Sequence, residues 1–237
     1  MNSVLFSKKI IWDGDSICAG NPEKGNWATR IAERNEMTYK NYAVGGGTLT
    51  EGFPLTDKGN KRHCVSLTVE KMYSEHPDAD YIIFEGGGND ADLFMRYFDT
   101  MGERMGALNP RDFSGNYDRE TFIGALESIF YRATQYWFGK KIGFIIAHKM
   151  GPEWDKFKER KIYFDVCAEV CRKWGIPCLD LWNGCYLNPY LPWMYHSERT
   201  PQENNEINDG FYSDGQHLTA LGYDFTTEIV EHWLLTL

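Results

Sequence analysis

The sequence has no run of Lys and Arg, and its 237 residues carry a formal net charge of −9. Nucleic acids and anionic membrane surfaces are bound through basic patches, so this charge balance argues against both as partners. No stretch approaches the roughly 18 consecutive apolar residues of a membrane-spanning helix. The N-terminal sequence MNSVLFSKKIIW lacks the apolar core and the cleavage site of a signal peptide. We therefore expect a cytoplasmic protein.

Motifs for metals and phosphates are also missing. The six cysteines include no CxxC pair joined by a second pair or by histidines, which is the spacing of a zinc site. The phosphate-binding pattern GxxxxGK[ST] does not occur. Cys167 and Cys171 are one helical turn apart, as is typical of a packed helix face. A chain of this length does not need disulfides, so we expect reduced and buried thiols.

The sequence does contain short apolar runs that alternate with helical patterns. The predicted strands are 8–12, 38–44, 81–84, 141–147 and 176–181, and the predicted helices are 26–36, 65–76, 117–138, 154–174 and 219–237. This alternation predicts an α/β fold in which helices cover both faces of a parallel sheet. No repeat, low-complexity tract or linker interrupts it. We expect one domain over residues 1–237, with irregular insertions near 91–116 and 183–213.

Polar and glycine-rich clusters fall at the ends of the predicted strands. GDS follows the first strand, AVGGGT ends the second, EGGGND follows the third, and SDGQHLTALG precedes the last helix. In an open parallel sheet, ligands bind beyond the carboxyl ends of the strands. We therefore expect these clusters to meet at one edge of the sheet.

Ser16 alone has two interpretations. A serine after Asp-Gly-Asp most often forms a turn or caps a helix, and it becomes a nucleophile only beside a base. His217 could be that base and Asp214 its partner, because a spacing of three places both side chains on one side of a turn. Taken alone, the same residues form a turn before the last helix. The other five histidines have no such setting, and we interpret them as structural or solvated.

Asn89 and the glycines 45–47 are open to the same two interpretations. Glycines permit positive φ and close backbone approach, and an Asn amide can donate to a developing oxyanion. Such a donor contributes roughly 2.7–4 kcal/mol in the transition state. Alternatively, both segments form ordinary turns.

In combination, these motifs are more specific. The order GDS, N-x-x-x-x-G, GGND and DxxH resembles the SGNH (GDSL-type) hydrolase superfamily. Its blocks are matched by residues 14–16, 41–46, 87–90 and 214–217, and the resemblance spans residues 10–225. It implies a three-layer α/β/α sandwich with a central parallel sheet of flavodoxin-like type. It also implies Ser16 as nucleophile, and no metal or organic cofactor.

The remaining roles follow from the same resemblance. It implies His217 as the base and Asp214 as the partner of that base. It implies an oxyanion hole formed by the backbone N–H groups of Ser16 and Gly46 with the side chain of Asn89. The glycine crowding leaves the register of the oxyanion glycine open by one residue.

Three neighbouring residues complete the set of candidates. Asp15 and Gly87 are expected to support the site, Asp15 by hydrogen bonding within its loop. We can assign no role to Asp13 within the resemblance.

The sequence therefore predicts a serine esterase that cleaves small acyl esters, with an acetylated carbohydrate as one candidate substrate. Two alternatives stay open. Asp13-x-Asp15 fits a magnesium-dependent phosphatase of the haloacid dehalogenase type, with Asp13 as nucleophile, but GGGND comes too early in the chain and no lysine motif is evident.

The second alternative is a non-catalytic carbohydrate-binding protein. It draws on the aromatic side chains in and around the insertion at 183–213, which we expect instead to pack that insertion onto the core: Trp182, Tyr186, Tyr190, Trp193, Tyr195, Phe211 and Tyr212. Segment 91–116 carries apolar residues, Phe94 and Met101 among them, that fit a lid or an oligomer contact.

Overall fold

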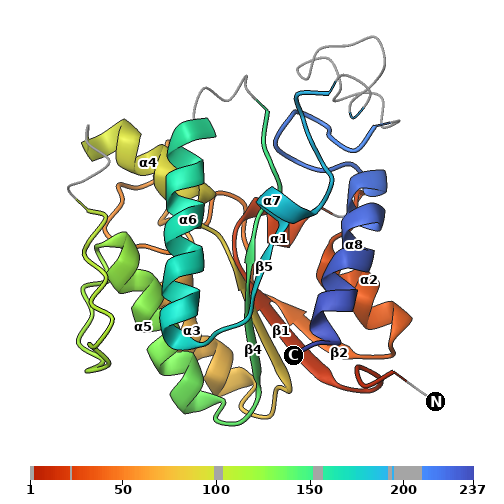
Figure 1. Cartoon of the computed structure of the whole chain (residues 1–237), viewed down its shortest axis with the longest axis horizontal. Helices are drawn as coiled ribbons and strands as arrows, with labels where there is room; N and C mark the ends of the chain where they lie inside the picture. Colours follow the sequence, from red (N-terminus) through yellow and green to blue (C-terminus); the bar gives the residue numbers. More distant parts are fainter. Residues whose placement is uncertain (1–2, 22, 99–103, 152–156, 192–193, 195–209) are drawn as a thin grey trace.

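The strands of the protein form one parallel sheet, in the order β2-β1-β3-β4-β5 (Figure 1). The structure is a computed structural model, and it describes residues 3–21, 23–98, 104–151, 157–191, 194 and 210–237. The strands are β1 (Lys9–Asp13), β2 (Thr38–Asn41), β3 (Tyr81–Glu85), β4 (Lys141–Ile146) and β5 (Cys178–Asp180).

Helices cover both faces of this sheet, so the predicted three-layer α/β/α architecture is confirmed (Figure 1). On one face α2 packs against α8, and on the other α5 packs against α3 and α6, while α4 packs against α6. Two single-turn helices, α1 and α7, follow β1 and β5 directly. The helices are α1 (Ser16–Ala19), α2 (Trp27–Arg34), α3 (Val65–Glu75), α4 (Gly88–Phe98), α5 (Phe122–Tyr136), α6 (Phe157–Trp174), α7 (Leu181–Gly184) and α8 (Ala220–Leu234).

The centre of the core lies at β1 and β3, which pair in register at Ile11 and Ile82. All five residues of β3 are buried, as are four of the five in β1. Continuous apolar runs of this kind are expected where helices cover both faces of a strand. The edge strand β2, by contrast, is largely exposed.

The strand order places a topological switch point between β1 and β3. The chain leaves β1 for β2 on one side and later returns to β3 on the other. Helices that leave two adjacent strands in opposite directions open a crevice beyond the carboxyl ends of those strands. Ser16 directly follows β1 and Asn89 closely follows β3, so both lie at this crevice.

The prediction that 91–116 is irregular is wrong at its start, because α4 occupies Gly88–Phe98. Ala91 and Phe94, three residues apart, are fully buried on one side of that helix. The glycines before it concealed this helical spacing. Residues 104–121 contain no helix or strand, and 99–103, with Met101, lie outside the described residues.

Two further boundaries differ from the prediction. The helix expected over 117–138 begins at Phe122, because Thr121 caps it by accepting a hydrogen bond from the Gly124 N–H. The second strand, expected to reach residue 44, ends at Asn41. The Asn41 side chain accepts from the Ala43 N–H and donates to the Cys18 carbonyl, so the chain turns there toward α1.

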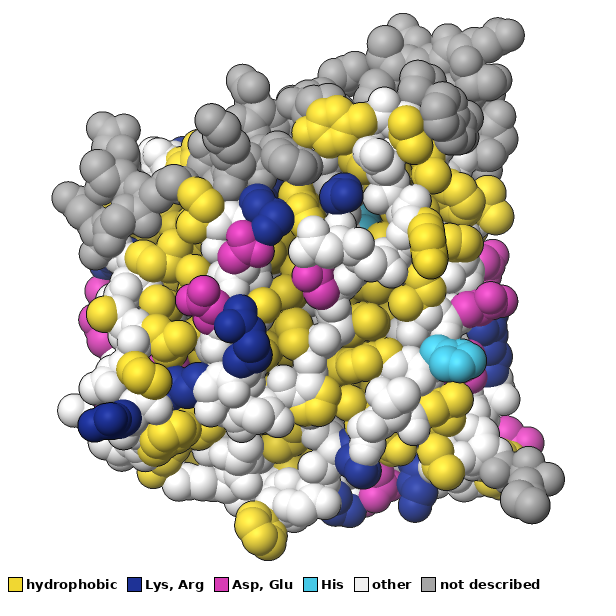
Figure 2. Space-filling model, in the orientation of Figure 1, with side chains coloured by type: hydrophobic (Ala, Val, Ile, Leu, Met, Phe, Trp, Pro, Cys, Tyr) yellow, Lys and Arg dark blue, Asp and Glu magenta, His cyan; other side chains and the backbone are white. Residues whose placement is uncertain are grey.

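The surface charges and the cysteines bear on the functions that the sequence argued against. On the face shown in Figure 2, Lys and Arg side chains lie among Asp and Glu side chains and form no continuous basic patch. Within the described ranges, no helix is long and apolar enough to cross a membrane. All six cysteines are free, and five of them are buried.

Candidate active site

The turn after β1 presents Ser16 at the edge of the sheet. Asp15 caps the short helix α1, because its Oδ1 accepts a hydrogen bond of 2.8 Å from the Ile17 N–H. This hydrogen bond lies within the loop of Asp15, where the sequence predicted one. A Cβ at Gly14 would lie 2.8 Å from Oε2 of Glu85 and 2.9 Å from its carbonyl, so only glycine fits. Ser16 itself is half-buried and faces the crevice.

His217 and Asp214 lie opposite Ser16. The His217 Nε2 is 3.0 Å from the Ser16 Oγ, although the two residues are 201 positions apart in the chain. The His217 Nδ1 is 2.7 Å from the Asp214 Oδ2. This contact favours the tautomer with a proton on Nδ1, which leaves Nε2 as an acceptor for the serine hydroxyl. The predicted convergence of the serine, histidine and aspartate is therefore found in the structure.

The Asp214 carboxylate is held as a charged acceptor. Its Oδ1 also accepts from the backbone N–H groups of Gln216, at 3.0 Å, and His217, at 2.7 Å. Partial burial raises the pKa of Asp214, but the hydrogen bond and charge of His217 outweigh that effect and hold the pKa below its ordinary value. The carboxylate can therefore stabilise an imidazolium at His217.

Buried polar groups hold the loop that carries His217. The His148 Nε2 is 2.8 Å from the Gln216 carbonyl, and the Gln216 Oε1 accepts a hydrogen bond of 3.1 Å from Arg160. Burial lowers the pKa of His148 to about 4, so its ring is neutral near neutral pH and donates to that carbonyl. On the other side, the Tyr223 hydroxyl of α8 donates to the carbonyl of Ile17 in α1. These bonds hold the loop that carries His217 and the helix α1 that begins at Ser16.

The glycine loop runs alongside Ser16. A Cβ at Gly45 would lie 3.9 Å from the Ser16 Cβ, and Gly46 has a positive φ of 75°. The Gly47 N–H already donates to the Val44 carbonyl. The N–H groups of Gly45 and Gly46 make no backbone hydrogen bond to another described residue. Both N–H groups are therefore available donors of this loop, and the choice between Gly45 and Gly46 stays open.

Asn89 lies in the first turn of α4, on the other side of the crevice. Its Nδ2 donates to the Gly47 carbonyl at 2.9 Å and makes a longer contact of 3.3 Å with the Asp15 Oδ2. The longer contact is the weaker of the two, so the hydrogen on that side can be shared with another acceptor. Gly87 precedes this turn with φ of 105° and lies against Phe122 and Cys167, where a side chain would not fit without strain.

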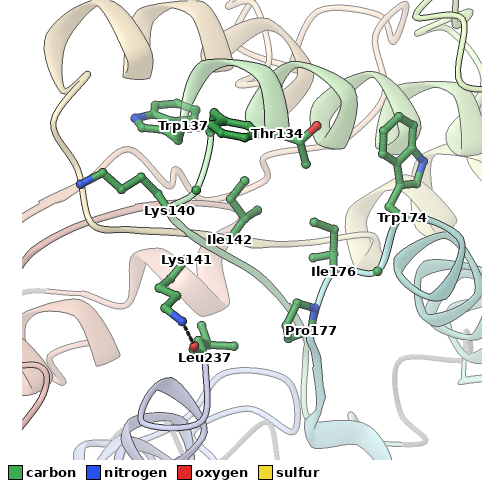
Figure 3. A pocket seen from close by; sticks show the side chains of 12 residues that line it. Thr134, Trp137, Lys140, Lys141, Ile142, Trp174, Ile176, Pro177 and Leu237 are labelled. Atoms are coloured by element: carbon green, nitrogen blue, oxygen red, sulfur yellow. Dashed lines mark hydrogen bonds between the residues drawn. The ribbon is translucent and has the colours of Figure 1, made fainter.

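A cavity of about 270 Å³ opens beside the serine and histidine. It is lined by Ser16, Gly20, Asn21, Lys24, Asp214, His217, Leu218 and Tyr223. A larger cavity, of about 390 Å³, lies near the start of β4 (Figure 3). Its lining includes Trp137, Trp174 and two lysines but no serine, histidine or carboxylate side chain. The chemistry is therefore concentrated in the smaller cavity.

Asp13, for which the sequence suggested no role, pairs with His63. The Asp13 Oδ1 is 2.7 Å from the His63 Nε2, and the Asp13 side chain is fully buried. Burial raises the pKa of Asp13, and this effect outweighs the opposing hydrogen bond and charge of His63. A carboxylate buried in this way cannot reach a phosphate group, so the phosphatase alternative has no accessible nucleophile. His63, expected to be structural or solvated, is structural.

The aromatic residues around 183–213 divide into two groups. Trp182 and Tyr212 are buried, and the Phe211 ring lies tilted against Phe225 of α8, so these pack the segment onto the core as expected. Tyr186 and Tyr190 are exposed instead. Trp193 and Tyr195 lie outside the described residues. The part of 183–213 that is described begins inside the short helix α7, which the sequence did not predict.

Phe94, which the sequence suggested as part of a lid or an oligomer contact, is fully buried in the core. It stacks on Tyr163 of α6 and lies edge-on to Phe53. Among the described residues, no group of three or more His, Cys, Asp or Glu side chains is placed to hold a metal ion.

Comparison with known proteins agrees with this geometry. Residues 14–225 match the model of the GDSL-like lipase/acylhydrolase family. No curated protein sequence matches the chain. Among solved structures, a protein from Lactobacillus plantarum superposes with a TM-score of 0.71 at 19% identity, over 97% of both chains.

Two other similar structures are named as esterases. Est24, a carbohydrate acetylesterase from Sinorhizobium meliloti, has a TM-score of 0.60 at 13% identity, over 97% of this chain and 99% of its own. An aryl esterase from M. smegmatis has a TM-score of 0.61 at 14% identity, with the same coverage of 97% and 99%. At these identities the likeness shows a common fold.

Proposed function

Because the chain belongs to the GDSL-like lipase/acylhydrolase family and is therefore a carboxylic ester hydrolase, we propose that Ser16, His217 and Asp214 form its catalytic triad. The observation that carries this proposal is the distance of 3.0 Å between the Ser16 Oγ and the His217 Nε2, at the mouth of a cavity. A serine hydroxyl stays protonated near neutral pH and needs a base at this distance to attack an ester.

The reaction proceeds in two steps. In the first, His217 takes the proton of Ser16 while the oxygen attacks the ester carbonyl, and the resulting imidazolium gives that proton to the leaving alcohol. In the second, His217 takes a proton from water, the hydroxide attacks the acyl-enzyme, and the proton returns to Ser16 as the acid leaves. Asp214 stabilises the imidazolium in both steps.

The oxyanion hole lies between the glycine loop and α4. We assign its donors to the backbone N–H groups of Ser16 and Gly46 and to the side chain of Asn89. Support comes from the lack of a backbone partner for the Gly46 N–H and from the long contact between Asn89 and Asp15. When an oxyanion forms, Asn89 keeps its bond to Gly47 and shares its other hydrogen, which points toward Asp15, with the oxyanion.

The cavity favours a small acyl group and a polar alcohol. Its volume of about 270 Å³ lies below the roughly 300–1,000 Å³ of pockets for drug-sized ligands. Asn21 and Lys24 give one wall a polar character. We propose short-chain acyl esters, acetyl esters first, as substrates, with an acetylated carbohydrate as the natural class suggested by the similar fold of Est24.

A panel of esters tests the proposal. We expect hydrolysis of p-nitrophenyl acetate, a steep loss of rate from acetate to octanoate, and release of acetate from acetylated sugars. Ser16→Ala should lose activity by roughly 10⁴-fold or more while its circular dichroism spectrum is unchanged. Retained activity in this variant contradicts the assignment of the nucleophile. A chelator such as EDTA should leave the wild-type rate unchanged, whereas loss of activity would favour metal-dependent chemistry.

A further inference from the structure

A second carboxyl group lies directly beneath the nucleophile turn. Glu85 is the last residue of β3, and its side chain is fully buried. Its Oε2 accepts a hydrogen bond of 3.2 Å from the Asp15 N–H and lies against Gly14. The chain continues from Glu85 through two glycines with positive φ toward Asn89. Glu85 therefore touches the turn that carries the serine and begins the segment that carries the oxyanion donor.

The carboxyl groups of Glu85 and Asp15 lie near each other, since the Glu85 Oε2 is 3.2 Å from the Asp15 nitrogen, and both side chains are buried. Two carboxylates buried this close to each other cannot both stay ionised, so we expect the pair to hold one proton. Burial raises the pKa of Glu85 well above its ordinary value, and the charge of Asp15 raises it further. The second oxygen of Glu85, Oε1, receives no N–H or O–H from the described residues, as expected if that carboxyl is protonated.

Asp15 is the member of the pair that carries the charge. Its Oδ1 accepts from the Ile17 N–H and its Oδ2 from the Asn89 side chain. Burial raises the pKa of Asp15 as well, but the hydrogen bond from the Ile17 N–H and the charge of Arg160 favour its ionised form. Other titratable groups that interact with Glu85 or Asp15 include Cys18 in α1, Asp90 in α4, Cys167 in α6 and Tyr223 in α8.

We propose that Glu85 acts as a protonated positioning residue, which donates a hydrogen bond to Asp15, holds the Ser16 turn against the segment leading to Asn89, and keeps the negative charge behind the oxyanion hole to a single unit. This inference rests on the proposed roles of Ser16 and Asn89. It goes beyond them, since Glu85 touches neither substrate nor the reacting atoms.

The reason for a neutral Glu85 is electrostatic. The transition state places a negative charge at the oxyanion hole, next to the Asn89 amide that also contacts Asp15. In a buried site, charges interact far more strongly than in water, so a second carboxylate behind the hole opposes that developing charge. Ionised Glu85 would also repel Asp15 and loosen the turn. Loss of the shared proton at alkaline pH should therefore lower kcat.

The test compares Glu85→Gln with Glu85→Ala. Glutamine is neutral, donates to Asp15 through its amide and accepts the Asp15 N–H, so we expect kcat within about three-fold of wild type near pH 7. Glu85→Ala removes both bonds and should lower kcat by about 30-fold or more, with KM within about two-fold. Titration of active serines with a serine-reactive organophosphate corrects each rate for the folded fraction.

The pH dependence of kcat separates the proposed role from a merely structural one, because a structural role would leave the shape of the profile unchanged. From about pH 6 to about pH 10, wild-type kcat should fall on the alkaline side, and Glu85→Gln should lack that fall. The matched control is Glu127→Gln, which replaces a buried glutamate of α5 that pairs with Lys173. It should keep the wild-type profile.

The outcomes separate the inference from the proposed function. If Glu85→Gln loses as much kcat as Glu85→Ala, or keeps the alkaline fall of wild type, the inference on Glu85 is wrong while the triad stands. If Ser16→Ala is active, the triad itself is wrong. Infrared spectra of the wild type alone supply a second reading: a protonated carboxyl band should persist at about pH 8, and its absence overturns the proposal.

Discussion

Among the residues that the structure describes, two Asp–His pairs have the same contact distance of 2.7 Å, and one of the two faces a serine. Asp214 and His217 are three residues apart on a loop at the mouth of a cavity, with side chains 27% and 34% exposed. Asp13 and His63 are 50 residues apart, and their side chains are 0% and 16% exposed.

The difference between the pairs lies in the use of the imidazole. His217 contacts its aspartate through Nδ1, which leaves Nε2 directed at the Ser16 Oγ. His63 uses Nε2 for Asp13, and its ring packs against the glycine loop, where a Cβ at Gly47 would lie 3.0 Å from the His63 Cδ2. An Asp–His contact therefore does not by itself identify a catalytic base. The second pair instead fixes the glycine loop to the end of β1.

The sharpest contrast should come from replacing each histidine by asparagine. His217→Asn removes the proposed base and should lower kcat/KM for p-nitrophenyl acetate by roughly 10⁴-fold or more. His63→Asn should lower it by less than about 10-fold, because His63 only supports the loop. Equal losses in the two variants would mean that His63 takes part in the chemistry.

Replacing each aspartate by asparagine should lower kcat more at Asp214 than at Asp13, by a smaller factor than for the two histidines. Asp214→Asn leaves His217 without a charged partner and favours the wrong tautomer, so kcat should fall by roughly 10²–10⁴-fold. Asp13→Asn should change kcat by less than about 10-fold. The measurement is kcat at saturating ester, corrected for the titrated active serines. A larger loss in Asp13→Asn than in Asp214→Asn would reverse the assignment of the pairs.

Removal of the histidine should cost more stability in the Asp13–His63 pair than in the Asp214–His217 pair, which is the opposite of the order expected for activity. His63→Ala leaves the fully buried Asp13 carboxyl without its partner, and we expect a loss of about 2–4 kcal/mol in the free energy of unfolding. His217→Ala should lose less than about 1 kcal/mol, since Asp214 keeps two backbone N–H groups and contact with water. Urea unfolding measures both. His63→Gln, which retains a donor, should recover part of the loss.

The smallest expected effect is the opposite pH dependence of the two aspartates. The pKa of Asp13 is raised, so its contribution to stability is present below about pH 3.8 and is lost as the pH rises through the folded-state pKa. The pKa of Asp214 is lowered, so its contribution is present above about pH 3.8 and is lost as the pH falls through its folded-state value.

Urea unfolding of the two Asn variants tests these signs. Relative to wild type, Asp13→Asn should gain stability as the pH rises from about 4 to about 7, and Asp214→Asn should gain as the pH falls below about 4. If the free energy of unfolding of both variants changes with pH in parallel with that of wild type, the expected signs of the two pKa effects are wrong.

The pair Asp214–His217 could be predicted from the sequence, and the pair Asp13–His63 could not. Asp214 and His217 share one turn, so their spacing alone places them together. Their meeting with Ser16 follows from the order of strands, because parallel strands bring their carboxyl ends to one edge. Alternating apolar runs likewise predicted the sheet and most helices. That the chain forms one domain and is cytoplasmic stays a prediction.

What the sequence did not predict depends on burial between distant segments. In the sequence, Asp13 and Glu85 look like ordinary polar residues at strand ends, and only the packed structure shows that both are buried near the turn that carries Ser16. Asn89 was predicted as a donor, but its contacts with Gly47 and Asp15 needed three segments in place. The helix α4 escaped prediction because its first residue is a glycine and its buried residues follow a glycine run.

The separation of 201 positions between Ser16 and His217 has a consequence for biosynthesis. Strand β1 leaves the ribosome well before α8, and the nascent polypeptide carries Ser16 without His217 beside it until the segment around α8 has been made and docked. Closing a loop of this length costs only about 3 kcal/mol more than closing one of ten residues, but non-local contacts form late and slowly. Recovery of ester hydrolysis during refolding should therefore lag behind the return of helical circular dichroism and report the arrival of α8 against α2.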